Sequence, residues 1–200
     1  MEKPKEDSIS LQIHSGQLII SNKSREEFFL ARYDSHYRIT KYRNYLNFIG
    51  GACEDEDSGP RETMEREVHE EVVDPEIAKQ LLLEAIPFAD YLFSPFEDER
   101  EAICSVYYTV VKQELLEKLK EQIKRDKKVL TEGLASVVKI EDIQSGKEKL
   151  AWNAASVMRD FLGDDSFLLR KGITTEKIGM PLSSFRDYEP TYSHKNTYWF

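Results

Sequence analysis

The stretch GGACEDEDSGPRETMEREVHEEVVD, residues 50–74, decides the fold of this chain. It places ten carboxylates in twenty-five residues, between a pair of glycines and a predicted helix. Gly59 or Ser58 is the expected N-cap of that helix, and Pro60 is its expected first residue, because proline lacks the amide hydrogen that the first turn leaves unpaired. Such a stretch is either a solvated acidic surface or a set of metal ligands.

The predicted helix has two different sides, since about 3.6 residues make one turn. One side is apolar and should pack on a core: Met64, Val68 and Val72. Another side carries three neighbouring carboxylates: Glu67, Glu70 and Glu71. These carboxylates repel one another, and Arg66 relieves only part of that repulsion. Mg²⁺ or Mn²⁺ would relieve it more fully, because hard cations prefer carboxylate oxygens and keep room for phosphate oxygens.

The residues around this helix resemble the Nudix box, G-x5-E-x7-R-E-U-x-E-E-x-G-U, in which U is a bulky aliphatic residue. REVHEEV, residues 66–72, matches the helical half at every defined position, and NFIGGACE, residues 47–54, resembles the strand and glycine turn before it. With one extra residue in the loop, Gly51 takes the glycine position and Asp57 takes the position of the first glutamate. Val73 stands where the box has its final glycine.

This resemblance implies an α/β fold, an α/β/α sandwich with a mixed β-sheet. From Gly163 on the pattern becomes irregular and aromatic, so we expect a Nudix hydrolase domain, residues 1–163, and an aromatic-rich C-terminal extension, residues 164–200. A plain tail of loops is the other interpretation of that extension. The implied activity is metal-dependent hydrolysis of a pyrophosphate bond in a nucleoside diphosphate derivative, such as ADP-ribose or a nucleotide sugar. The alternative is a catalytically weakened Nudix-fold module that binds a nucleotide or a protein. The altered loop and Val73 favour that alternative, whereas the retained arginine and glutamates favour the enzyme.

The resemblance also implies roles for single residues. Mg²⁺ or Mn²⁺ would be held by Glu67, Glu70 and Glu71, with a further contact from Glu54. Arg66 would orient a catalytic glutamate. The general base varies in the family, and its candidates here are Glu99 and Glu101 in the acidic stretch FSPFEDEREA, residues 93–102, and Glu132. A solvated loop is the other interpretation of that stretch. The predicted substrate-binding residues are Arg32, Gly50 and Gly51, although Arg32 and its basic neighbours could simply balance a surface.

Composition limits the partners. The 200 residues carry a formal net charge of −9, which argues against binding to duplex nucleic acid. The start MEKPKEDSIS has no apolar core, so no signal peptide is expected, and no apolar run is long enough to cross a membrane. Cys53 and Cys104 form no disulfide framework, and a cytoplasmic protein is therefore expected. A small nucleoside diphosphate-type molecule is the expected partner, and the aromatic C-terminus makes a homodimer plausible.

The rest of the chain is expected to alternate strands and helices. Residues 9–20 should form a hairpin that turns at Ser15-Gly16. Further strands are expected at 27–33, 45–49, 103–111 and 135–140, with Gly50-Gly51 ending the second of these. Two amphipathic helices are expected at 113–130 and 147–162, and Tyr91 is expected to pack in the core.

Overall fold

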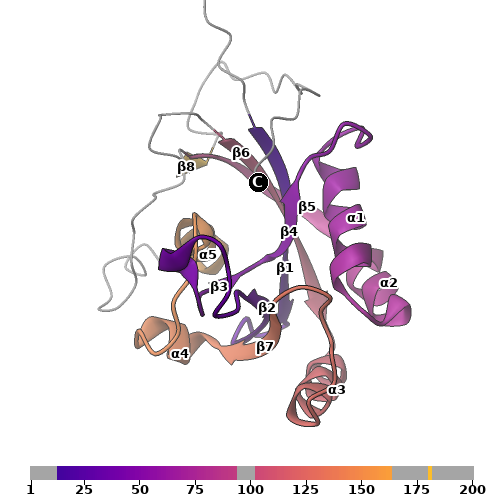
Figure 1. Ribbon diagram of the computed structural model, residues 1–200, viewed down its shortest axis with the longest axis vertical. Coiled ribbons are helices and arrows are strands. Elements are labelled where there is room, and N and C mark those ends of the chain that lie inside the picture. Colours follow the sequence, from indigo (N-terminus) through magenta and orange to yellow (C-terminus); the bar gives the residue numbers. More distant parts are fainter. Residues whose placement is uncertain (1–12, 94–101, 164–179, 182–200) are drawn as a thin grey trace, which may run out of the picture.

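The computed structural model describes residues 13–93, 102–163 and 180–181, which form three layers around one mixed sheet (Figure 1). The eight strands of these described residues run in the order β3-β2-β1-β6-β5-β8, with β4 paired to β1 and β7 paired to β2. The strands are β1 Ile13–Asn22, β2 Glu27–Arg32, β3 Leu46–Asn47, β4 Ile49–Ala52, β5 Ile86–Phe93, β6 Ala102–Val111, β7 Leu134–Lys139 and β8 Met180–Pro181. The helices are α1 Pro60–Glu71, α2 Pro75–Leu83, α3 Gln113–Lys124, α4 Ile140–Gln144 and α5 Ala154–Leu162, with a 3₁₀ turn at Thr40–Tyr42.

The centre of the sheet is a parallel pair, β1 and β6, joined over ten residue pairs from Ile13↔Ala102 to Asn22↔Val111. The other strand pairs are antiparallel. The short strand β4 lies along the first half of β1, and the chain passes from it directly into the acidic loop and α1. This arrangement holds the acidic stretch against the middle of the sheet.

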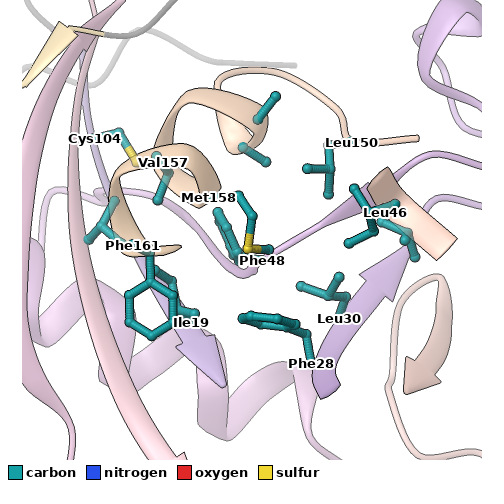
Figure 2. Close-up of a cluster of buried hydrophobic side chains, with 14 of the residues drawn as sticks. Ile19, Phe28, Leu30, Leu46, Phe48, Cys104, Leu150, Val157, Met158 and Phe161 are labelled. Atoms are coloured by element: carbon teal, nitrogen blue, oxygen red, sulfur yellow. The ribbon is translucent and has the colours of Figure 1, made fainter. Parts of the chain in front are cut away.

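Each face of the sheet buries its own apolar core. Helices α4 and α5 cover one face, where Phe28, Phe48, Met158 and Phe161 pack together (Figure 2). Helices α1, α2 and α3 cover the other face, and Met64, Val68 and Val72 of the α1 region lie in that core as the helical pattern predicts. The α/β/α arrangement with a mixed sheet is therefore confirmed.

The predicted hairpin at residues 9–20 is wrong over its described part, because residues 13–22 form a single strand. Gly16 does not make a turn. It lies where α1 crosses β1, and a Cβ atom there would sit 2.3 Å from the carbonyl oxygen of Pro60 and 2.9 Å from the backbone nitrogen of Met64. Gly50 and Gly51 likewise do not end a strand, since they lie inside β4 opposite Gln17 and Gly16. Because these glycines have no side chain, α1, β1 and β4 can approach one another closely.

The two amphipathic helices expected in the second half of the chain are present, but their boundaries differ from the prediction. The helix at 113 ends at Lys124 rather than Leu130, and Asp126 takes a positive φ of 54° just after it. The last helix begins at Ala154 rather than at 147. A further helix, α2, begins at Pro75, and the carboxylate of its N-cap Asp74 accepts hydrogen bonds from the amides of Glu76 and Ile77. Tyr91 is fully buried, as expected.

The division of the chain at residue 163 remains a prediction. Only Met180 and Pro181 of the expected extension fall within the described residues, and they pair with Leu92 and Tyr91 of β5. Among the described helices, none combines the length and the apolar character that a membrane span requires.

Candidate functional site

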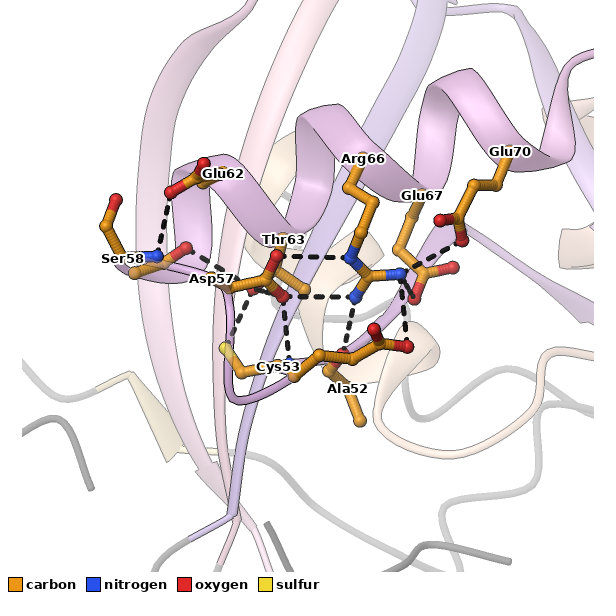
Figure 3. A network of polar contacts seen from close by, with 11 residues as sticks. Ala52, Cys53, Asp57, Ser58, Glu62, Thr63, Arg66, Glu67 and Glu70 are labelled. Atoms are coloured by element: carbon orange, nitrogen blue, oxygen red, sulfur yellow. Dashed lines mark hydrogen bonds and ion pairs between the residues drawn. The ribbon is translucent and has the colours of Figure 1, made fainter. Parts of the chain in front are cut away.

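Helix α1 presents its polar side next to β4 because its apolar side is fixed in the core. Met64 and Val68 are fully buried. The N-cap is Gly59 and the first helical residue is Pro60, as the sequence predicts. The opposite side of the helix therefore carries Arg66 and the glutamates along the acidic loop (Figure 3).

Arg66 is the centre of a polar network that ties the acidic loop to the helix. Its Nε and Nη2 atoms donate to the two carboxylate oxygens of Asp57, each at 3.1 Å, and Nη2 also donates to the carbonyl oxygen of Ala52 at 3.0 Å. Its Nη1 donates to Glu67 at 3.1 Å and to Glu70 at 3.0 Å, and lies 3.5 Å from Glu54 (Figure 3). One guanidinium thus fixes the loop and two of the expected metal ligands.

Asp57 is the buried anchor of the loop, with its side chain 3 % exposed. Besides the two bonds from Arg66, it accepts hydrogen bonds from the backbone amide of Glu54 at 2.9 Å and from the hydroxyl of Thr63 at 2.8 Å. Burial opposes its ionisation, but the hydrogen bonds from Arg66, Glu54 and Thr63 outweigh burial and lower its pKa. A bidentate arginine–carboxylate pair of this kind keeps the loop rigid.

Glu67 lies in a space that Gly51 leaves open. A Cβ atom on Gly51 would sit 2.3 Å from a carboxylate oxygen of Glu67, so the missing side chain makes room for this carboxylate. Burial raises the pKa of Glu67 to about 7, with Arg66 lowering it and Glu70 raising it further. The side chain is 16 % exposed, so Glu67 is a partly enclosed carboxylate that gains from a further positive charge.

Glu71 is more deeply enclosed and lacks a compensating partner. Its Oε2 atom is buried and has no hydrogen-bond partner among the described residues. Burial raises its pKa well above the ordinary value, and the negative charges of Glu67, Glu132 and Glu70 raise it further. A buried carboxylate oxygen without a donor is costly, and coordination to a cation is one way to satisfy it.

The segment before β7 brings Glu132 to this end of α1. The backbone amide of Thr131 donates to the carbonyl of Glu71 at 2.7 Å, and the Thr131 hydroxyl donates to the carbonyl of Glu70 at 2.7 Å. The next residue, Glu132, is exposed and acts on the charge of Glu71. The charges of Glu67, Glu70 and Glu132, from two distant parts of the sequence, therefore all act on Glu71 at the C-terminal end of α1.

These carboxylates fit a divalent cation in chemistry, although their present arrangement is set by Arg66. No three of the acidic, His or Cys side chains in the described ranges converge with the spacing of a metal centre. Glu70 and Glu54 point at the guanidinium instead, and both are more than half exposed, so rotation about their side-chain bonds is open to them. The orphaned oxygen of Glu71 and the carboxylate of Glu67, which occupies the space over Gly51, are what a hard cation would use.

The other predicted site residues stand apart or lie beyond the described ranges. Glu99 and Glu101 lie outside the described residues. Arg32 donates to Glu148 at 2.8 Å, to the carbonyl of Asn44 at 2.9 Å and to Ser136 at 3.3 Å, and none of these is a box residue. Its role in substrate binding remains a prediction. The spacing of the box predicts a place for Asp57 in the loop but not its bond to Arg66, and no pattern in the sequence indicates a role for Thr63, a polar residue on the buried side of α1.

The fold that carries this site is the Nudix fold. A mutT/nudix family protein from Listeria innocua superposes with a TM-score of 0.51 at 17% sequence identity, covering 78% of this chain and 97% of that one. Shewanella oneidensis NrtR superposes with a TM-score of 0.51 at 11% identity, covering 78% of this chain and 65% of that one. No protein-family model matches the sequence, and the comparison with curated proteins finds no match. The likeness is therefore one of fold.

Proposed function

We propose that this protein is a hydrolase that depends on a divalent cation and cleaves a pyrophosphate bond in a nucleoside diphosphate derivative. The observation that carries the proposal is the enclosed carboxylate group at the end of α1, in which Glu67 and Glu71 both have raised pKa values and Glu71 has an orphaned oxygen. A surface helix in water has no need to bury like charges together.

Mg²⁺ or Mn²⁺ bound by Glu67, Glu70 and Glu71, with help from Glu54, would neutralise charge on a diphosphate and make a bound water more acidic. The chain's own residues prepare the site for this. Arg66 holds the carboxylate of Glu67 in place through Nη1 while Asp57 fixes the other side of the guanidinium.

Burial raises the pKa of Glu67 to about 7 and raises that of Glu71 well above its ordinary value, and the negative charges of Glu67, Glu132 and Glu70 add to the rise at Glu71. Both side chains are proposed cation ligands, and a bound cation favours their charged form. We therefore expect the proton of the attacking water to go to a carboxylate that does not hold the cation. The candidates are Glu132, whose charge acts on Glu71, and Glu99 and Glu101.

The proposal is tested by a hydrolysis screen with Mg²⁺ and with Mn²⁺, covering ADP-ribose, nucleotide sugars, dinucleoside polyphosphates and nucleoside triphosphates. The Glu70→Gln variant is run beside the wild type. Glutamine keeps an oxygen for Arg66 but loses the charge, so turnover should fall by at least about 10–100-fold, the loss typical of disturbing a metal site.

The matched control is Glu65→Gln on the same helix. Glu65 pairs with Arg61 at 2.8 Å on the solvent side, so this change should leave turnover unaltered. Absence of turnover on every substrate, together with no Mn²⁺ binding by calorimetry, would refute the enzyme and leave the weakened binding module as the better description.

A further inference from the structure

The chain turns from the C-terminal end of α3 toward β7 (Figure 1), and a pocket of about 420 Å³ is lined by residues of this segment. This volume falls within the range of roughly 300–1,000 Å³ that small-molecule sites occupy. Its apolar wall includes Ile123, Val129 and Leu134, and Leu134 is 56% exposed at the surface. An apolar wall of this kind suits the flat or aliphatic body of a small ligand.

The same pocket gathers positive charge in a chain whose net charge is −9. Arg32, Lys127 and Lys128 line it, against one acidic residue, Asp126. The guanidinium of Arg32 is already bonded to Glu148, whereas the ammonium groups of Lys127 and Lys128 have no ion pair within the described part of the chain. Adjacent lysines are suited to a phosphate, which they bind as point charges. Asp126 could accept a hydrogen bond from a hydroxyl of the same ligand.

We propose that this pocket is a regulatory site that binds a small molecule with a phosphate monoester on a flat or apolar body. The segment that forms its wall also holds the acidic site on its other side. The carbonyl of Val129 accepts a hydrogen bond from the amide of Val73 at 3.0 Å, and Thr131 bonds to Glu71 and Glu70. A ligand at Lys127 and Lys128 therefore restrains the backbone that positions Glu132.

Coupling between two sites is reciprocal, so a ligand that tightens cation binding is itself bound more tightly when the cation is present. The pocket needs no hydrolysis in order to bind, and its occupancy is measurable when the cation is removed. Failure of this proposal is thus distinguishable from failure of the proposed function.

The test is isothermal titration calorimetry with AMP in EDTA, with adenosine and inorganic phosphate as partial probes. AMP should bind at one site per chain with a Kd below about 1 mM. Adenosine has the flat base and the ribose of AMP without the phosphate, and inorganic phosphate has the charge without the nucleoside. Each should therefore bind at least about 10-fold more weakly than AMP, a loss of 1.4 kcal/mol in binding free energy. The double variant Lys127→Gln/Lys128→Gln should weaken AMP binding by about 10-fold or more.

The matched control is Lys23→Gln/Lys112→Gln, which removes the same charge at the other end of α3 and should leave AMP binding unchanged. Leu134→Ser, at an exposed position with little risk to folding, should weaken AMP but not inorganic phosphate. Repeating the AMP titration with saturating Mn²⁺ should change its Kd at least about threefold in the wild type.

Three results would overturn the proposal. AMP fails to bind in EDTA, or it binds equally well to the Lys127→Gln/Lys128→Gln variant, or it binds only with Mn²⁺ and loses that binding in Glu70→Gln, which would place it in the acidic site. Binding that passes these checks but does not respond to Mn²⁺ would overturn the regulatory role.

Discussion

Replacing Asp57 tests whether the buried bond to Arg66 holds the acidic loop together. The carboxylate accepts four hydrogen bonds, two from Arg66 and one each from Glu54 and Thr63. Asparagine has one accepting oxygen and one NH₂ group. Asp57→Asn therefore removes the negative charge and puts an NH₂ group where a carboxylate oxygen accepted hydrogen bonds, so that two donors face each other.

Breaking a buried ion pair costs about 3–5 kcal/mol, and Arg66 keeps Glu67 and Glu70 as partners, so we expect a loss of about 3 kcal/mol at pH 7. Urea unfolding followed by circular dichroism should show this as a midpoint lower by about 1–2 M. Asp57→Glu should also destabilise, by about 1–3 kcal/mol, because an extra methylene must fit in a buried loop position.

The pH dependence of this loss has a definite sign. The folded-state pKa of Asp57 lies below its ordinary value of 3.8, so its stabilisation is complete above pH 3.8 and is lost as the pH falls through the folded value. The difference between wild type and Asp57→Asn should therefore be constant from pH 7 to about 5 and shrink below about 4. The control is Glu56→Gln, its exposed neighbour, which should change stability by less than about 0.5 kcal/mol. If Asp57→Asn is as mild as this control at pH 7, the loop is held by something other than the Asp57–Arg66 bond.

Three further predictions concern the glycines and Glu67. In a chelator, Glu67 should lower the unfolding free energy by up to about 3 kcal/mol as the pH rises from about 4.5 to 7, because a carboxyl whose pKa is raised to about 7 binds its proton more tightly when folded. Glu67→Gln should remove this part of the slope in denaturation across pH 4–8, and the raised pKa of Glu71 should leave a remaining slope of the same sign. Gly51→Ala should lower Mn²⁺ affinity in calorimetry by about 10-fold or more, because its Cβ takes the space of the Glu67 carboxylate, whereas Gly59→Ala, with open space around it, should not. Gly16→Ala should lower the unfolding free energy by about 1–3 kcal/mol, since its Cβ meets the backbone carbonyl of Pro60; a stability equal to wild type would show that α1 shifts freely on β1.

The sequence predicted the features that follow from local periodicity. The residues of α1 alone were enough to predict the burial of Met64 and Val68 and the start of the helix at Pro60. Gly16 shows the limit of such a window. A glycine beside a serine is typical of a turn, and the reason for a glycine here lies in a helix more than forty residues later in the chain.

The candidate site was predictable as a set of helical glutamates but not as an enclosed group. Thr131, from a segment distant in the sequence, donates a backbone hydrogen bond to the carbonyl of Glu71, and the charge of its neighbour Glu132 raises the pKa of Glu71. The spacing of residues within 50–74 cannot predict a contact with a segment that far along the chain. The roles assigned to the glutamates, to Arg32 and to Glu99 remain predictions for the experiments above.

The parallel pairing of β1 with β6 has a consequence for how the chain is made. Ile13 meets Ala102, so 89 residues separate the partners, and sheets with such distant pairings fold slowly. At a synthesis rate of about 5–20 residues per second, one edge of β1 waits on the order of 5–20 s for its partner to leave the ribosome. Strands β2 and β4 reach the other edge earlier, so an antiparallel meander can form first. During that interval Leu18, Ile19 and Ile20 belong to a half-built sheet, which is the stage at which a chaperone would have the most to protect.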